Sequence, residues 1–128
     1  PLKRLESVSR SLGLMDDGEF LSKYTKLKLD VDDLATTYSR FADVFRSGKP
    51  LGPEASMLKV WATETFCRLV DLLIETAGDS GGLRGEIDVG GQRVDILSPF
   101  YIGFVATIAA GSNEIQRNIL AKRVLNLA

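Results

Sequence analysis

The chain has 128 residues, a length at which one domain can bury a hydrophobic core of its own. Hydrophobic residues make up 45% and charged residues 26% of the chain, which is typical of a globular protein. Sixteen basic residues against seventeen acidic ones leave a net charge of −1, which argues against charge-driven binding to nucleic acid or to an anionic membrane surface.

Two residue types are scarce enough to exclude whole classes of site. The sequence contains no histidine, which excludes Ser-His-Asp catalysis, HExxH metalloproteases and zinc sites that use histidine. The single cysteine, Cys67, cannot form an internal disulfide, and its apolar helical surroundings favour a buried, unreactive thiol. A reducing compartment suits this cysteine usage and no signal peptide is visible, so we expect a cytoplasmic protein.

The first half of the chain predicts helices. Leu2–Leu14 predicts a short helix that ends near Gly13. Over Glu19–Ser47, apolar residues then recur at alternating intervals of four and three, at Phe20, Tyr24, Leu27, Val31, Leu34, Tyr38, Phe41 and Phe45. This heptad pattern predicts a long helix over Glu19–Arg46, either in an intermolecular coiled coil or packed antiparallel in a bundle. Because aromatic side chains are bulky for a two-stranded coil, we favour the bundle.

A second long helix is predicted over Pro53–Ala77, packed antiparallel to the first. Proline in the first turn and an acidic residue after it, Glu54, are typical of a helix N-terminus. The apolar stripe of this helix begins at Trp61 and is wide enough for burial on more than one side. The glycine-rich stretch Asp79–Asp95 follows and predicts a loop or a short hairpin around Gly90-Gly91.

The last third of the chain begins with eighteen residues that carry no charge, Ile96–Asn113. Since serine, proline, glycine and threonine interrupt this run, we expect a segment that crosses the protein interior rather than a membrane span. A final helix is predicted after an N-cap at Ser112, with an acidic residue in its first turn and basic residues in its last.

Together these elements predict an all-α protein, an antiparallel helical bundle that forms a single domain over residues 1–128. Because the first residue is proline, a processed product and a piece of a longer protein both stay open. The apolar stripe Trp61–Ala77 and the uncharged run exceed what one small bundle can hide, which predicts a homodimer or a larger assembly.

Most acidic residues have an ordinary structural interpretation. Asp30, Asp32 and Asp33 are neighbours on a helix and point in different directions, so we interpret them as a solvated face rather than a catalytic or metal-binding group. The polar cluster Ser112-Asn113-Glu114 is different, because it places free backbone N–H groups after Gly111 at a helix N-terminus. Such a terminus either binds a phosphate or carboxylate ligand or is an ordinary helix cap, and both interpretations stay open.

Two segments point to a known family. Ala106–Leu125, with the sequence ATIAAGSNEIQRNILAKRVL, resembles the C-terminal signature of the acyl-CoA dehydrogenases, which is close to I-Y-x-G-[TS]-x-E-I-Q-R-N-I-I-A-x-x-x-L. A second block, GPEASMLK at Gly52–Lys59, is similar to the start of the long helix in one branch of that family. The order and spacing of the two blocks fit over essentially the whole chain.

The resemblance implies the four-helix C-terminal domain of a larger flavoenzyme that binds FAD and oxidises acyl-CoA to 2-enoyl-CoA. It also implies an electron-transfer flavoprotein as partner and oligomers that assemble through this domain. Gly111, Ser112 and Glu114 match motif positions expected near the adenosine and pyrophosphate portion of the flavin. Gln116 and Arg117 match as structural or cofactor-side groups. No metal is implied.

The chain also departs from the family pattern. Ala110 stands where many members carry the catalytic glutamate, and other members carry that base on an earlier helix, which would lie before Pro1 or at its very start. The flavin motif Gln-x-x-Gly-Gly-x-Gly is replaced by Glu75–Gly81, and a glutamate there should weaken pyrophosphate binding through its negative charge. An Arg-x-x-Phe-Gly motif survives only in part, at Ser9–Gly13, and Gly82–Val94 resembles an insertion.

Three functions follow from this sequence. The first is the C-terminal domain of an acyl-CoA dehydrogenase whose base lies elsewhere or on a partner subunit, so that this chain alone is inactive and binds no FAD. The second is a non-catalytic family relative that serves as a helical assembly or interaction subunit. The third is an unrelated helical bundle that acts as a binding module, which requires the motif match to be chance.

Overall fold

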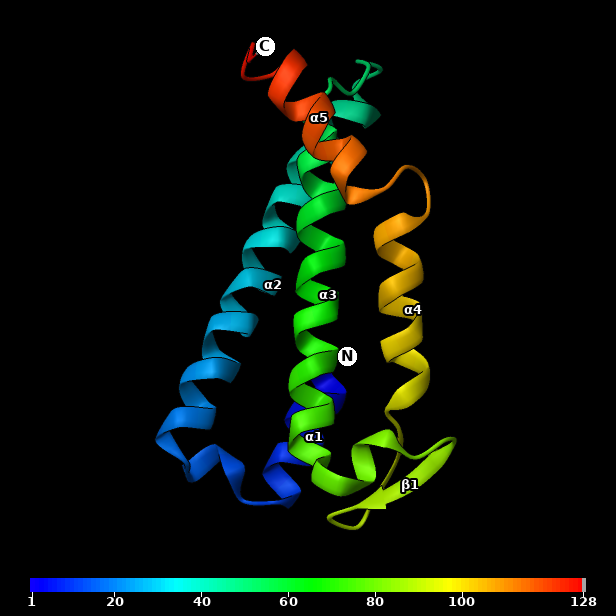
Figure 1. Ribbon diagram of the computed structural model, residues 1–128. Helices are drawn as coiled ribbons and strands as arrows, with labels where there is room; N and C mark the ends of the chain where they lie inside the picture. The colour runs from blue at the N-terminus through cyan, green and yellow to red at the C-terminus, as the bar shows by residue number, and fades with distance from the viewer. Residues whose placement is uncertain (128) are drawn as a thin grey trace.

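The computed structural model describes residues 1–127 and is a bundle of helices with one small hairpin. Helices α2, α3 and α4 run side by side, with α3 in the middle, and α5 crosses the end of the bundle at which α3 begins (Figure 1). The elements in chain order are α1 (Leu2–Ser11), the 3₁₀ turn η1 (Leu14–Asp16), α2 (Gly18–Arg46), α3 (Ala55–Ala77), the 3₁₀ turn η2 (Gly78–Gly82), β1 (Glu86–Val89), β2 (Gln92–Asp95), α4 (Leu97–Ile108) and α5 (Asn113–Arg123). The predicted all-α bundle is confirmed.

Helix α2 begins where the sequence predicts, because Asp17 caps it. The carboxylate of Asp17 accepts a hydrogen bond from the backbone N–H of Phe20 at 2.7 Å. Helix α3 begins at Ala55, two residues later than predicted. Pro53 and Glu54 precede it in a turn, in which their carbonyl groups accept N–H groups three residues further on.

The antiparallel packing of α2 and α3 is also confirmed (Figure 1). Lys23, near the start of α2, pairs with Glu75, near the end of α3, with 2.9 Å between the nitrogen and the oxygen. Further along, Arg68 of α3 pairs with Asp30 of α2 at 3.0 Å. The start of α2 thus pairs with the end of α3, and residues later in α2 pair with residues earlier in α3, as an antiparallel arrangement of the two helices requires.

The hydrophobic core lies at the end of the bundle where α1, the first half of α2, the second half of α3 and the hairpin meet. Its buried members are Leu5, Val8, Tyr24, Leu27, Leu69, Leu72, Leu73, Val89, Val94 and Ile96. Each fully buried leucine or isoleucine among them contributes about 1.5–3 kcal/mol relative to an exposed position. The core thus concentrates hydrophobic stabilisation at the C-terminal end of α3.

The hairpin packs into this core and also contacts α1. Strands β1 and β2 pair antiparallel around Gly90 and Gly91, whose φ angles of +60° and +77° lie in the left-handed region that tight hairpin turns require. One face of the hairpin buries Val89 and Val94 in the core, and the guanidinium of Arg4 donates to the Asp95 carbonyl at 2.6 Å. The hairpin that the glycine pair predicts is confirmed.

The expectation that Ile96–Asn113 crosses the interior is wrong for most of its length. More than half of each side chain is exposed at Tyr101, Ile102, Phe104, Val105 and Ile108. Within residues 1–127, α4 packs closely against α3 alone, so only one of its faces is covered (Figure 1). Gly103 lies on that face, where a Cβ would stand 3.1 Å from the Cys67 sulfur.

The heptad pattern of α2 is likewise buried only in part. Tyr24 and Leu27 belong to the core, whereas Tyr38 and Phe45 are about two-thirds exposed. Those two residues lie outside the hydrophobic core, and no element of the described chain fully covers their side of α2. None of the helices in residues 1–127 combines the length and the hydropathy that a bilayer-crossing segment requires.

Candidate functional site at the start of α5

The residues expected to contact a cofactor lie in the sharp turn between α4 and α5. Ala110 and Gly111 both have positive φ, +55° and +87°, so the backbone turns sharply between α4 and α5. A side chain costs about 1–2 kcal/mol in this conformation, whereas glycine adopts it freely. A Cβ on Gly111 would also stand 2.8 Å from the amide nitrogen of Gln116, which itself donates to the Ala110 carbonyl at 3.2 Å.

Ser112 ends the turn and is the N-cap of α5. Its backbone is extended, with φ −61° and ψ 159°, so the helix begins at Asn113. The first N–H groups of a helix have no intrahelical acceptor and carry the positive end of the helix dipole. Glu114 lies in this first turn with an exposed side chain, and a hydrogen bond from the Ser112 side chain lowers the pKa of its carboxyl group. Glu114 is therefore ionised at neutral pH.

Asn113 is the buried residue of the site, with only 4% of its surface exposed. Its carbonyl oxygen accepts a hydrogen bond from the Lys59 ammonium at 2.5 Å. Its amide nitrogen donates to the Thr63 hydroxyl at 3.0 Å and to the Glu64 carboxylate at 3.2 Å. An ammonium on one side and a carboxylate on the other fix which way the amide points. One side chain of α5 is thus held by three residues of α3.

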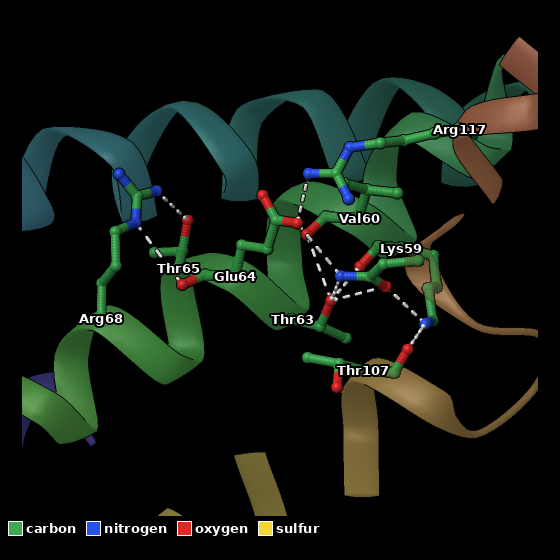
Figure 2. Close-up of polar contacts among 9 residues, drawn as sticks. Lys59, Val60, Thr63, Glu64, Thr65, Arg68, Thr107 and Arg117 are labelled. Carbon is green, nitrogen blue, oxygen red and sulfur yellow. Dashed lines mark hydrogen bonds and ion pairs between the residues drawn. The ribbon is translucent and has the colours of Figure 1, made fainter. Parts of the chain in front are cut away.

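Two further contacts extend this polar cluster. Lys59 also donates to the carbonyl of Thr107 in the last turn of α4, at 2.9 Å (Figure 2). On the opposite side, the guanidinium of Arg117 pairs with Glu64 (Figure 2). The polar cluster, defined as Lys59, Thr63, Glu64, Asn113 and Arg117, therefore ties α3 to both helices that flank the turn.

An open hollow of about 560 Å³ lies against the polar cluster, between α3 and α5. It is lined by Glu64, Cys67, Arg68, Thr107, Asn113, Glu114 and Arg117. Both arginines in this lining are already paired, Arg117 with Glu64 and Arg68 with Asp30. Cys67 is partly rather than fully buried, but burial raises the pKa of its thiol, which favours the protonated, less reactive form.

The other candidate residues lie away from the turn. Asp30 and Asp32 form separate ion pairs, with Arg68 and with Lys28, as a solvated face does. Glu75, which replaces the family's glutamine, lies at the opposite end of α3 and pairs with Lys23. The pairing offsets the negative charge that we expect to weaken pyrophosphate binding. No group of potential metal ligands occurs in residues 1–127.

Sequence reasoning singled out Gly111, Ser112 and Glu114, which lie in the turn and the start of α5, but it did not assign a role to the α3 half of the polar cluster. Lys59 closes the GPEASMLK block, and Thr63 and Glu64 follow it by about one helical turn. That spacing puts Lys59 and Thr63 on one face of α3. The signal was present, but a polar patch on one helix does not reveal which residues of another helix meet it.

The turn fits the anionic portion of a dinucleotide on two observations of this structure. Gly111 is exposed and has no side chain, which leaves its backbone open to a ligand, although the Gln116 amide lies 2.8 Å from where a Cβ would stand. The first N–H groups of α5 are donors that suit phosphate oxygens, and the Ser112 hydroxyl joins them only by leaving Glu114. The ionised Glu114 does not suit a phosphate, but it can accept hydrogen bonds from sugar hydroxyl groups.

Comparisons with known proteins agree with this fold and this motif. The sequence profile of the family described as "Acyl-CoA dehydrogenase, C-terminal domain" matches residues 10–125. The chain therefore belongs to that family, which confirms the resemblance and removes the unrelated binding module from the three functions. No curated protein matches the chain.

Two solved structures share the fold. One carries the description "Tcur3481-Tcur3483 steroid ACAD" and superposes with a TM-score of 0.84 at 17% sequence identity, covering 99% of this chain and 33% of that one. The other, a G363A variant with the same description, gives a TM-score of 0.82 at 20% identity and the same coverage. The chain thus spans about a third of the length of the structures that it matches.

Proposed function

We propose that this chain is the C-terminal domain of an FAD-dependent acyl-CoA dehydrogenase and that the α4–α5 turn contacts the cofactor. One observation carries the proposal: in a member of this family, the motif glycine, Gly111, adopts a left-handed backbone directly before the N-terminus of α5. In this proposal the remaining parts of the flavin and acyl-CoA sites lie in segments outside these 128 residues. If these 128 residues were the whole protein, the α4–α5 turn would line only one side of the cofactor site.

Each residue of the turn has a distinct task in this proposal. The first N–H groups of α5 bind phosphate oxygens of FAD, while the Ser112 hydroxyl donates to Glu114. Glu114 stays ionised and accepts hydrogen bonds from ribose hydroxyls. Gly111 contributes no side chain and lets the cofactor approach. FAD supplies the electron acceptor for acyl-CoA oxidation, and an electron-transfer flavoprotein takes the electrons onward.

A cofactor-binding measurement with a matched glycine control tests this proposal. Gly111→Ala and Gly48→Ala both place a side chain at positive φ, +87° and +77° in this structure, so both introduce a similar backbone strain, and Gly111→Ala must in addition displace the Gln116 side chain. A Cβ at Gly48 meets nothing within 4 Å. In the full-length protein that contains this chain, we expect Gly111→Ala alone to weaken FAD binding, measured by flavin fluorescence. Equal FAD affinity in both variants, or no FAD binding by the unmodified protein, would contradict the proposal.

A non-catalytic relative remains the second candidate, and Ala110 favours it. This alanine stands at the usual position of the base and cannot take a proton, so activity requires a carboxylate elsewhere. If a base lies elsewhere, the full-length protein bleaches its flavin when acyl-CoA is added, and Ala110→Glu is not needed. If the protein holds FAD but bleaches only as the Ala110→Glu variant, the non-catalytic function is correct.

We also propose that the outer face of α4 assembles the protein into a homo-oligomer or pairs it with a related subunit. The face consists of Tyr101, Ile102, Phe104, Val105 and Ile108, each more than half exposed. A contiguous apolar surface of this kind is typical of an interface. Val105→Glu should shift the protein to smaller species in sedimentation experiments, whereas Arg40→Glu, on exposed α2, should not. A monomer at high micromolar concentration without any substitution would contradict this assembly.

A further inference from the structure

The α4–α5 turn is anchored on both sides by one side chain, that of Lys59. Before the turn, its ammonium donates to the Thr107 carbonyl at 2.9 Å. After the turn, the same ammonium donates to the Asn113 side-chain oxygen at 2.5 Å. The turn between these two anchor points holds Ala110, Gly111 and Ser112. Since Lys59 lies on the long helix α3, it fixes both ends of the turn to a rigid element.

Both acceptors of the Lys59 ammonium are neutral oxygens, which makes these contacts directional rather than a simple charge pair. Hydrogen bonds that involve a charged group are shorter and about twice as strong as neutral ones. The Lys59 side chain is partly buried, so water screens these bonds less than those of the exposed pairs on α2. The contact to Thr107 also satisfies a carbonyl in the last turn of α4, which has no intrahelical donor.

The second anchor is oriented by its own partners. Asn113 offers its oxygen to Lys59 because its nitrogen faces Glu64 and the Thr63 hydroxyl. Asn113 is also the first residue of α5, directly beside Ser112 and Glu114. A displacement of the Lys59 ammonium therefore moves the start of α5, where the N–H groups for the cofactor lie.

We propose that Lys59 is the positioning residue of the cofactor turn, acting through the Thr107 carbonyl and the Asn113 side chain without touching the cofactor itself. This inference rests on the proposed function for its consequence in FAD binding, but the anchoring of the turn stands on the contacts of Lys59 alone. Loss of the ammonium should loosen residues 109–114 and leave the core at the opposite end of α3 unchanged.

Lys59→Met in the full-length protein tests this proposal, because methionine keeps the apolar stem and removes the ammonium. Lys122→Met is the matched control, since Lys122 lies on the exposed last turn of α5. In the absence of FAD, we expect hydrogen exchange at the amides of Ala109 and Gln116, which are hydrogen-bonded on either side of the turn, to accelerate about tenfold or more in Lys59→Met. The amides of Leu69–Leu73 should keep their protection, and Lys122→Met should exchange as the unmodified protein does.

The cofactor gives the second measurement. The dissociation constant for FAD should rise about tenfold in Lys59→Met, and Lys59→Arg, which keeps a charged donor, should recover part of the affinity. Restored FAD affinity in Lys59→Arg separates positioning from a general loss of folding. If Lys59→Met does not fold, Asn113→Ala removes one anchor and gives the same two measurements.

The outcomes separate this inference from the proposed function. Unchanged exchange at Ala109 and Gln116 would overturn the role of Lys59, whether or not the protein binds FAD. Faster exchange with unchanged FAD affinity would also overturn it, because the turn would then be anchored without a consequence for the cofactor. Faster exchange in a protein that binds no FAD in its unmodified form would leave Lys59 as the anchor of the turn and refute the proposed function.

Discussion

The two ends of helix α3 are held in place by different chemistry. At the C-terminal end, Leu69, Leu72 and Leu73 pack into the core against α1, α2 and the hairpin. At the N-terminal end, Lys59, Thr63 and Glu64 meet α4 and α5 through hydrogen bonds and an ion pair. The first end is dry and the second is polar, although both belong to one continuous helix of 23 residues.

The difference shows how one helix separates stability from geometry. Hydrophobic burial is strong but has no direction, so it holds α3 without fixing the orientation of single groups. Hydrogen bonds contribute less net free energy, but they require defined distances and angles. A turn that must present backbone N–H groups to a ligand needs the second kind of contact, and the polar cluster supplies it.

The largest effect is expected at the dry end. Leu73 is fully buried, so Leu73→Ala should lower the free energy of unfolding by about 2–5 kcal/mol through lost burial and a residual cavity. Leu29→Ala is the control, because Leu29 is exposed on α2 and should change stability by less than about 0.5 kcal/mol. Urea denaturation measures both. A loss at Leu73 as small as at Leu29 would remove the contrast between the two ends.

A smaller loss is expected at the polar end. Asn113→Leu keeps the branching at Cγ but removes every hydrogen bond to Lys59 and Glu64, which should cost about 1–3 kcal/mol. The control Asn118→Leu alters an exposed position of the same helix and should be nearly neutral. Urea denaturation again gives the measurement. If the two leucine variants are equally stable, the buried amide does not hold α5 to α3.

Asn113→Asp sharpens the same point, because it keeps the oxygen that faces Lys59 but places a second oxygen beside Glu64, where the amide nitrogen now lies at 3.2 Å. Two carboxylates at that distance repel each other, and the repulsion ends when one of them binds a proton. The variant should therefore be less stable than the unmodified protein at neutral pH and recover part of the loss in acid. Melting temperatures at a series of pH values measure this, and a loss that does not depend on pH would contradict it.

The ion pair at the edge of the polar cluster should contribute little. Glu64 and Arg117 are 41% and 52% exposed, so Glu64→Gln should cost less than about 1 kcal/mol. Glu75→Gln removes a more exposed pair, that of Glu75 with Lys23, and should cost still less. Added salt should shrink both effects, because it screens exposed charges. A cost at Glu64 that matches the cost at Asn113 would show that the charge, not the amide, is the main link.

The smallest effect is expected at Asp95, which caps α4 at the dry end. Its carboxylate accepts the Ser98 N–H at 3.1 Å, and hydrogen bonds from Ser98 lower the pKa of its carboxyl below the ordinary 3.8. A lowered pKa in the folded state stabilises the protein at every pH above about 3.8, and that contribution fades as pH falls through the folded value. Asp95→Asn should therefore lower the melting temperature slightly at neutral pH and by less as the pH falls below 3.8. A difference that persists unchanged in acid would contradict this assignment.

The sequence by itself determined several helices, the hairpin turn and the residues at which these elements begin or end. The heptad pattern predicted α2, Asp17 capped it at the expected place, and Gly90-Gly91 made the hairpin turn. The Gly111-Ser112 turn before α5 was also readable, since a motif glycine before a capping serine is a local signal. These features depend on backbone geometry within a few residues, so a single stretch of chain contains all the information that they need.

The tertiary structure decided which faces are covered and which polar groups meet. Tyr24 and Tyr38 occupy equivalent places in one apolar pattern, yet of the two only Tyr24 is buried, because the hydrophobic core lies at that end of α2. Lys59 and Asn113 lie 54 residues apart in the chain and meet only because α5 crosses the start of α3. Periodicity shows on which face of a helix a residue lies, but the element that packs against that face depends on the path of the rest of the chain.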